Sequence, residues 1–444
     1  MPRRARPAIG RITVGNEPAL FDEIRTKMAQ RSRPERASLT AEMHSRKLPP
    51  FTAPARLMQI VLLASDAELE AAAAHFGAGA ARHAVVDLGG ATLVWERHSE
   101  FATYNFIVPG QFDAPFDEEA FAPFVAPWLD RMPGAIIRSS FLAIGRAGMP
   151  GTHPEHLEAW FDANDLVVCD VQEGRARIWS DFRLHGGFGR MFIAMRDDDT
   201  RRIPALVQSL LELGNYRKLA LLGLPEAQKH GPELRRIEED LAQLSGDIDR
   251  EARPREQLLH AIGELGSRIA QIAATTRYRM SATAAYAAIC DDRVRTLAVS
   301  AVNGGPTLVG FTQRRLHPAV QTCASFVQRL DDLAGRVTWT AELLRTRIDT
   351  EIAAQNRDLL ASLDRRNAMQ LRLQQTVEGL SVAAISYYAV SLVGYLAKAS
   401  HAAWHWPNYE LATGISVPFV VAIVAWTTHR VRKAHAAHDD HGKA

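Results

Sequence analysis

Two apolar runs without charged side chains, residues 380–396 and 411–428, constrain this chain more than any other feature. Each run approaches the roughly 20 residues that a helix needs to cross a bilayer core about 30 Å thick. Lys and Arg residues precede the first run and follow the second, whereas residues 399–410 between the runs contain neither. The alternative, two buried helices of a soluble domain, does not explain this asymmetry. The positive-inside rule therefore predicts a multi-pass protein of a bacterial inner (plasma) membrane, with both termini in the cytoplasm.

The cations that flank the two runs predict contacts with the lipid bilayer. A basic side chain at the membrane surface gains about 1 kcal/mol from anionic headgroups. The residues expected to make these contacts are Arg365, Arg366, Arg372, Arg430, Arg432 and Lys433.

A polar stripe marks the first apolar run. Helical spacing places Ser381, Tyr388, Ser391 and Tyr395 on one face, with Glu378 one turn before them. Polar groups that face lipid lose hydrogen bonds, so this face is expected to turn toward protein or water. Two interpretations stay open. The stripe packs on the second run, or it lines a pore in a homo-oligomer, where Glu378 would attract cations, divalent ones included.

A long helix is expected to lead into the first run. From Arg336 onward the sequence has no Pro before the membrane and only Gly379 as a helix-weakening residue, and apolar residues recur at helical spacing. About 60 residues at 1.5 Å each would give a coiled-coil type of stalk roughly 90 Å long. The alternative is two shorter helices with a break near Asn367.

The preceding residues predict strands first and helices afterwards. Between residues 56 and 199, short apolar segments alternate with turn signals such as Gly89-Gly90, and most connections are too short for helical crossovers. The predicted fold class is α+β: an N-terminal, mainly antiparallel or mixed sheet domain with helices, then a helical bundle with a long stalk helix that leads into a two-span transmembrane hairpin. The predicted domains are an Arg/Pro-rich arm (1–55), an α/β sheet domain (56–199), a helical domain (200–335), a stalk helix (336–379), a first span (380–398), an external loop (399–410), a second span (411–428) and a basic, His-rich cytoplasmic tail (429–444).

Charge and cysteine content exclude some classes of protein. The chain has 52 Lys plus Arg and 50 Asp plus Glu, so its formal net charge is +2. This balance argues against a globally basic nucleic-acid-binding protein, and we expect no nucleic-acid partner. The three cysteines lie far apart, which offers neither a disulfide framework nor a zinc motif and fits a reducing cytosol.

Sequence motifs for catalysis are missing, and we expect neither an enzyme nor a bound cofactor. The chain contains no GxxxxGK[ST], HExxH or GxSxG motif. In the sheet domain, strand alternation places Glu96 and His98 on one face, with Glu100 beside them if the strand continues. These three titratable groups form a candidate polar site, and the alternative is an exposed sheet face.

Three other segments are interpreted as surface features. Residues 186–189, Gly-Gly-Phe-Gly, precede a strand and predict a turn rather than a phosphate-binding loop. The histidines of residues 153–156 and 435–441 could bind a divalent metal, but a surface loop and a solvated tail are the favoured interpretations.

Several long segments carry a resemblance to a known family. They are residues 343–390 (LLRTRIDTEIAAQNRDLL to SYYAV), 95–98 (WERH), 100–104 (EFATY), 216–219 (YRKL) and 314–319 (RRLHPA). Together they resemble a bacterial family of membrane-anchored proteins of unknown function, domain of unknown function 3422. The resemblance covers nearly the whole chain and implies no known activity.

The order of elements also resembles that of CorA-type magnesium transporters. Their Gly-Met-Asn signature ends the first span, where this chain has Tyr395-Leu396-Ala397-Lys398 instead. We therefore expect a membrane-anchored module for scaffolding or sensing. The alternatives are a CorA-like oligomeric cation channel or transporter, and an enzyme with its site in the sheet domain.

Overall fold

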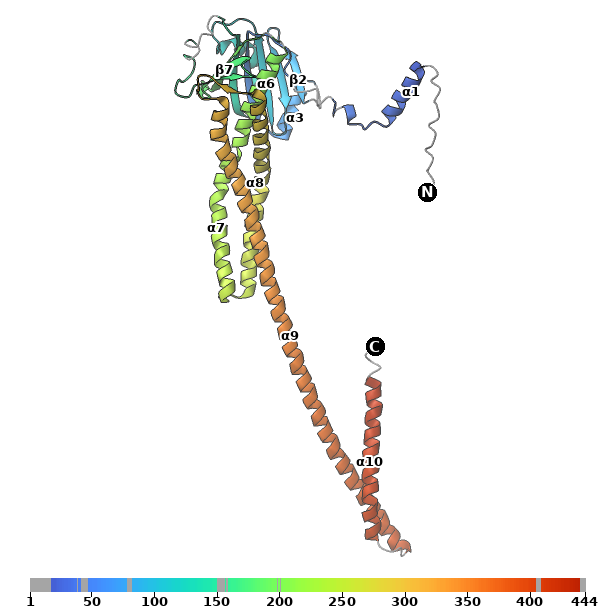
Figure 1. Cartoon of the computed structure of the whole chain (residues 1–444). Helices are drawn as coiled ribbons and strands as arrows, with labels where there is room; N and C mark the ends of the chain where they lie inside the picture. The colour runs from blue at the N-terminus through green and yellow to red at the C-terminus, as the bar shows by residue number, and fades with distance from the viewer. Residues whose placement is uncertain are drawn as a thin grey trace, which may run out of the picture. The chain divides into compact units, whose positions relative to one another are not determined.

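The computed structural model describes residues 17–37, 39–40, 47–77, 82–149, 156, 159–197, 199, 201–404 and 409–439. The chain divides into two compact units (Figure 1). The first comprises residues 1–252 and 260–339, and the second comprises residues 253–259 and 340–444. The element types follow the predicted order, with a mixed sheet first and long helices afterwards, so the α+β class is confirmed.

A ten-stranded sheet forms the centre of the first unit, in the order β10-β6-β7-β9-β5-β1-β4-β3-β2, with β8 paired to β9. All neighbouring pairs are antiparallel except β5 and β9, which run parallel. The parallel pair arises because the β6–β7 hairpin is inserted between β5 and β9 along the chain. The strands are β1 (Ala55–Leu63), β2 (His83–Asp87), β3 (Thr92–Arg97), β4 (Phe101–Pro109), β5 (Ala135–Arg146), β6 (Val167–Val171), β7 (Ala176–Ser180), β8 (Leu184–His185), β9 (Phe188–Met195) and β10 (Ser300–Ala301).

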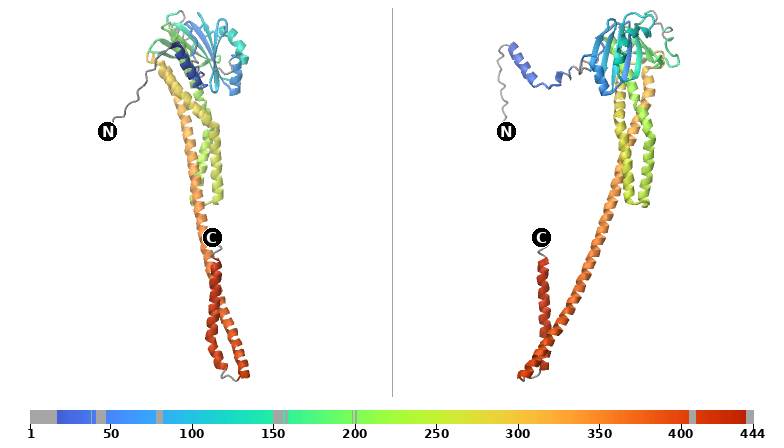
Figure 2. Two further views of the ribbon diagram at one scale, coloured as in Figure 1. Left: turned by 90° about the vertical axis from the view of Figure 1, so that its right-hand side faces the viewer. Right: turned by 180° about the vertical axis from the view of Figure 1, so that it is seen from behind.

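Both faces of this sheet are covered. On one face, leucines of α6 (Arg202–Leu221) pack on Leu142 and Ile193, together with Leu297 of α8 (Arg255–Leu297) and Leu308 of α9 (Leu308–Trp404). On the other face, α3 (Asp66–Ala74) and the short turns η1 (Glu119–Phe121), α4 (Ala122–Val125) and η2 (Ala126–Arg131) cover an aromatic core. Strand alternation therefore sends successive side chains into two separate cores, and Figure 2 shows helices on both sides of the sheet.

Ion pairs join the helices that continue from the sheet. Arg268 of α8 contacts Glu233 at 2.6 Å and Asp240 at 2.8 Å, both on α7 (Gly223–Arg250). Arg329 of α9 contacts Glu238 of α7 at 2.9 Å. The N-terminal arm contains a further described helix, α1 (Glu17–Gln30).

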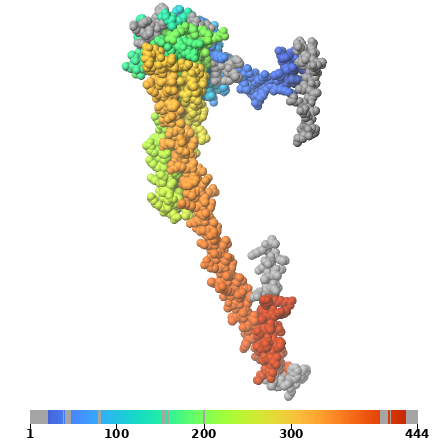
Figure 3. Space-filling model, in the orientation of Figure 1, coloured from blue at the N-terminus to red at the C-terminus, as the bar shows by residue number. Residues whose placement is uncertain are grey.

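One uninterrupted helix replaces the separate helices that the sequence predicted on either side of residue 335. Helix α9 has 97 residues and continues through Arg336 and Asn367. The alternative with a break near Asn367 is therefore wrong, because nothing in that stretch interrupts the backbone hydrogen bonds of the helix. Most side chains of its middle part are exposed, Ile352, Leu359 and Leu363 among them, so within the described chain these residues make no coiled-coil contact. Figure 3 shows this part of α9, in orange, as a single rod.

The second unit contains the rest of α9 and α10 (Tyr409–Asp439). Within the described residues, α9 is the one helix that is long and apolar enough to cross a membrane. The second predicted span lies on α10 but includes residue 412, whose side chain falls outside the described residues. The two-span hairpin therefore stays a prediction.

Candidate functional site

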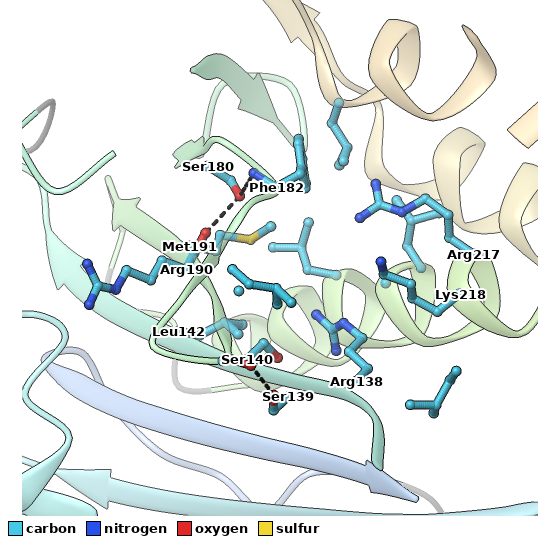
Figure 4. A pocket seen from close by; sticks show the side chains of 18 of the residues that line it. Arg138, Ser139, Ser140, Leu142, Ser180, Phe182, Arg190, Met191, Arg217 and Lys218 are labelled. Atoms are coloured by element: carbon cyan, nitrogen blue, oxygen red, sulfur yellow. Dashed lines mark hydrogen bonds between the residues drawn. The ribbon is translucent and has the colours of Figure 1, made fainter. Parts of the chain in front are cut away.

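A cavity of about 290 Å³ opens between the sheet and α6 in the first unit (Figure 4). Strand β5, the turn before β9 and helix α6 supply most of its walls. Its apolar walls come from Leu142, Phe182, Met191, Leu210 and Leu213. Its polar lining consists mainly of cationic side chains and serines, and this charge distinguishes it from an ordinary packing defect.

Arg138 of β5 faces this cavity by ordinary strand alternation, because it lies two residues before Ser140 and four before Leu142, which line the same cavity. The register between β1 and β5 shifts just before Arg138, so that Val61 pairs with Arg138 while Leu62 pairs with Ile136. The Arg138 guanidinium donates hydrogen bonds to the Gln59 amide oxygen and, at 2.8 Å, to the Asn215 amide oxygen.

Helix α6 supplies the other two cations. Arg217 and Lys218 lie three and four residues after Gly214, so the three positions share one face of the helix. A side chain at Gly214 would place its Cβ 2.6 Å from an Arg138 nitrogen, so the glycine makes room for that guanidinium. Figure 4 shows Arg138, Arg217 and Lys218 directed toward one side of the cavity.

None of these three cations forms an ion pair with a carboxylate among the residues that the structure describes. Arg217 donates to the Thr312 hydroxyl at 3.4 Å, and its guanidinium carbon lies 4.7 Å from the centre of the Phe182 ring and 5.3 Å from that of Phe311. Both arginines are surrounded by protein yet keep some accessible surface, because each contributes to the wall of an open cavity.

Burial and mutual repulsion disfavour the charged forms of these groups. Burial, with a smaller contribution from Arg217, lowers the pKa of Arg138 to about 9. Burial also lowers the pKa of Arg217 to about 10, and Arg315 adds to this effect. The pKa of Lys218 is lowered by partial burial and by both arginines. Both arginines remain cationic at pH 7, so the cavity concentrates positive charge without a carboxylate partner among the described residues.

Further polar groups surround the same space. The Ser140 hydroxyl is buried and has no hydrogen-bond partner among the described residues. Ser139 donates to the Gly187 carbonyl at 2.6 Å, which attaches the turn to β5. Gly186 and Gly187 have φ values of +57° and +93°, so the predicted turn requires a conformation that glycine adopts freely. Arg190 also lines the cavity, but its guanidinium points away from the three cations (Figure 4).

The polar site predicted at Glu96, His98 and Glu100 is divided between two clusters. A Glu96 carboxylate oxygen lies 3.6 Å from a His98 ring nitrogen, whereas Glu100 contacts Arg279 and Tyr286, each at 2.7 Å. Strand β3 ends at Arg97, so the alternation does not continue to Glu100. The side chains of Glu96, His98 and Glu100 are only 11–12% exposed, so this part of the sheet is not an exposed face.

The Glu96–His98 pair nevertheless adjoins the cationic cavity. Both residues line a small neighbouring cavity together with Gln59 and Asn215, the two amides that accept hydrogen bonds from Arg138. Neutral amides therefore stand between the cationic cavity and the predicted polar pair.

The predicted stripe of the first apolar run is exposed in the described chain. Tyr388 and Tyr395 are each 73% exposed. The hydroxyls of Ser381 and Ser391 donate to backbone carbonyls one turn earlier, at 2.9 Å and 2.8 Å. Glu378 accepts a hydrogen bond from Gln374 at 3.3 Å. Because the serine hydroxyls have partners on their own helix, they do not require protein or water on that face.

A different face of α9 lies against α10. Ser386 is buried, and a Cβ added at Gly394 would lie 3.4 Å from the Thr413 methyl group. Small residues that allow such close approach are typical of helix contacts in membranes. Gly414 of α10, by contrast, has open space around it.

The cations expected at the lipid surface are only partly described. Arg365, Arg366, Arg372 and Arg430 are exposed, and Arg430 lies 5.0 Å above the Trp426 ring. The side chains of Arg432 and Lys433 lie outside the described residues, as do residues 153–155 and the side chains of the His-rich tail. Within the described part of the chain, no group of three or more His, Cys, Asp or Glu side chains is arranged to hold a metal ion.

Sequence reasoning missed the cationic cavity, although signals for it exist. Arg138 interrupts an apolar strand, and a charged residue at an inward position of a strand is rare unless it has a partner. Arg217 and Lys218 fall within the YRKL segment, one of those that carried the family resemblance. Their meeting with Arg138 depends on how α6 packs on the sheet and on the space left by Gly214, which sequence periodicity does not reveal.

Fold and site together define a class: an α+β head with a cationic cavity, followed by a long helix that contains a candidate membrane span. Residues 31–435 match the family model described as "Protein of unknown function (DUF3422)", and the chain belongs to this family. No curated protein and no solved structure matches the chain.

Proposed function

We propose that this protein is a membrane-anchored binding module whose head senses a small anion in the cationic cavity. The observation that carries the proposal is the Arg138 guanidinium, whose hydrogen-bond partners among the described residues are the neutral amides of Gln59 and Asn215. A buried charge without a counter-charge is costly, and proteins normally pair it. Arg217 and Lys218 on the same wall raise that cost, and a bound anion would offset it for all three groups.

Binding without catalysis agrees best with the lining of the cavity. Among the described residues that line it, none is a carboxylate or an imidazole. The cavity thus offers cations and hydroxyls that hold an anion, but not the groups most often used as a general base.

Membrane anchoring rests on apolar side chains that the described chain leaves exposed. Leu380, Leu392 and Leu396 are 75%, 64% and 63% exposed, in a stretch of α9 without a charged residue. A continuous apolar surface of this kind is unfavourable in water and suits a bilayer core. We propose that α10 supplies the second span, that both termini are cytoplasmic, and that the protein forms a homo-oligomer in the bilayer.

Ion transport of the CorA type is the second candidate. The exposed stripe at Tyr388 and Tyr395 favours it, since copies of the chain could place this face around a shared path. Against it stand the different sequence at the Gly-Met-Asn position and the serine hydroxyls already bonded to their own helix. Divalent-cation flux into liposomes that contain the purified protein separates the two candidates.

Calorimetric titration of the detergent-solubilised full chain with inorganic phosphate tests the binding proposal. We expect saturable binding to the native protein and to Arg235→Gln, which removes an equivalent charge from the exposed surface of α7. We expect none to Arg138→Gln or Arg217→Gln. Equal binding by all four proteins would contradict the proposal.

A further inference from the structure

The mouth of the cationic cavity carries two exposed apolar side chains. Ile136 is 63% exposed and Leu184 is 69% exposed, and both line the same cavity as Arg138. Ile136 lies two residues before Arg138 on β5, and Leu184 lies on β8. The cavity thus has cations on one side and apolar side chains at its entrance.

We propose that the ligand is an organic phosphate monoester with an apolar body, whose phosphate contacts Arg138, Arg217 and Lys218 and whose body extends over Ile136 and Leu184. This inference rests on the proposed function, because it names the class of anion that the head binds.

Charge and geometry favour phosphate over a single carboxylate. A phosphate monoester carries a charge of about −1.5 to −2 at pH 7 and three acceptor oxygens. Three cations without a carboxylate partner match that charge better than the single charge of a carboxylate does. The planar arginine groups can donate two parallel hydrogen bonds to phosphate oxygens. The unpartnered Ser140 hydroxyl supplies one more donor on the same wall.

Size and lining favour an apolar body on that phosphate. The volume of about 290 Å³ is at the lower end of the range for small-molecule sites, so it holds more than an inorganic ion. Leu142, Phe182, Met191, Leu210 and Leu213 continue the apolar surface inward from the entrance. A ligand without apolar atoms would leave this surface against water.

An alkyl phosphate can come from solution or from a membrane lipid. Both sources present a phosphate monoester attached to a hydrocarbon portion. The chemistry of the cavity is the same for a soluble metabolite of this class and for the headgroup of a phosphatidic acid, so the experiment needs an arm for each.

A chain-length series tests the inference on the solubilised full chain. The probes are inorganic phosphate, then ethyl, butyl and hexyl phosphate, with hexanoate as the carboxylate control. We expect the dissociation constant to fall by up to about fourfold for each methylene that becomes buried. Hexanoate should bind much more weakly than hexyl phosphate.

The apolar entrance is tested by Ile136→Ser combined with Leu184→Ser. Both side chains are exposed, so this variant should keep the native melting temperature. It should lose most of the gain between ethyl and hexyl phosphate. The matched control is Leu129→Ser, since Leu129 is 57% exposed and does not line the cavity.

The outcomes separate this inference from the proposed function. If inorganic phosphate and every ester fail to bind, the proposed function is wrong. If inorganic phosphate binds but longer esters bind no tighter, or if hexanoate equals hexyl phosphate, only the present inference is overturned. Where hexyl phosphate binds, its displacement by phosphatidylcholine vesicles that contain phosphatidic acid, but not by pure phosphatidylcholine vesicles, supports the inference with a lipid source. Lack of displacement by both supports it with a soluble source.

Discussion

At the residue scale, the unpaired arginines connect stability with binding. Arg217 has a hydroxyl and two aromatic rings as neighbours, but no carboxylate partner among the described residues. Replacing a poorly compensated buried charge with an apolar side chain of similar size is often neutral or stabilising. The presence of the Arg217 charge in the cavity wall is therefore better explained by a ligand than by folding.

Arg217→Met tests whether this arginine serves ligand binding rather than folding. The methionine side chain can pack on the Phe182 and Phe311 rings. In buffer free of phosphate, we expect the free energy of unfolding to stay the same or to rise by about 1 kcal/mol. Urea unfolding with and without phosphate provides the measurement. A loss of several kcal/mol without phosphate would show that the arginine is a structural requirement.

The pH dependence of ligand stabilisation follows from the lowered pKa values. In the folded protein, the pKa of Arg138 is about 9 and that of Arg217 about 10, both below the ordinary value of 12.5. Between the folded and ordinary values, the unfolded chain binds more protons, so the ligand-free protein gains stability as pH rises. Phosphate needs the charged forms, so its stabilising effect should be full at pH 7 to 8 and should decline above about pH 9. Melting temperatures with and without phosphate over this range provide the measurement, and a constant difference up to pH 10.5 would contradict the assignment.

At the element scale, α6 combines two tasks along one face. Leu206 and Leu210 bury the helix on the sheet, while Gly214, Arg217 and Lys218 form the cationic wall. A glycine inside a helix lowers its stability relative to alanine by roughly 1 kcal/mol. Gly214 is therefore better explained by the space that Arg138 occupies than by helix formation.

Gly214→Ala separates the effect of this glycine on helix stability from its effect on the position of Arg138. The added methyl group would meet the guanidinium end of the Arg138 side chain, which would have to shift. We expect the melting temperature without phosphate to stay the same or to rise, and the affinity for phosphate to fall by tenfold or more. The matched control is Gly246→Ala on α7, where a Cβ meets no neighbouring atom. Unchanged affinity in Gly214→Ala would contradict the role given to this glycine.

The elements differ in how far the sequence could predict them. Period-two alternation and Gly89-Gly90 predicted the strands from β1 to β4, and the absence of helix breakers predicted an uninterrupted helix through residue 367. The parallel pairing of β5 with β9 was not specified by the sequence, because it depends on where a distant hairpin inserts. The same limit applies to the site. Glu96 and His98 were found by alternation, but the cavity needs Arg138 of β5 and Gly214 of α6, which meet only in the fold.

At the scale of the whole molecule, the account combines a binding head with a membrane anchor in one chain. The cavity belongs to the first unit, and the candidate span belongs to the second. An anchored sensor requires that both properties occur in the same molecule, and each can be tested separately.

Reporter fusions test the proposed topology. The charge asymmetry around residues 399–410 predicts that a reporter at Trp404 lies outside the cytoplasm and that a reporter at the C-terminus lies inside it. A periplasm-active enzyme and a cytoplasm-active enzyme fused at each position provide the measurement. Cytoplasmic signals at both positions would contradict the two-span hairpin.

The central claim is that the head binds an anion through its unpaired cations, and thermal unfolding of the full chain in detergent tests it most directly. Increasing phosphate should raise the melting temperature of the native protein, with a stabilisation of about 2.7 kcal/mol at 100 times the dissociation constant. The same titration should leave a combined Arg138→Gln and Arg217→Gln variant unchanged. A native protein that does not respond, or a double variant that responds equally, would contradict the account.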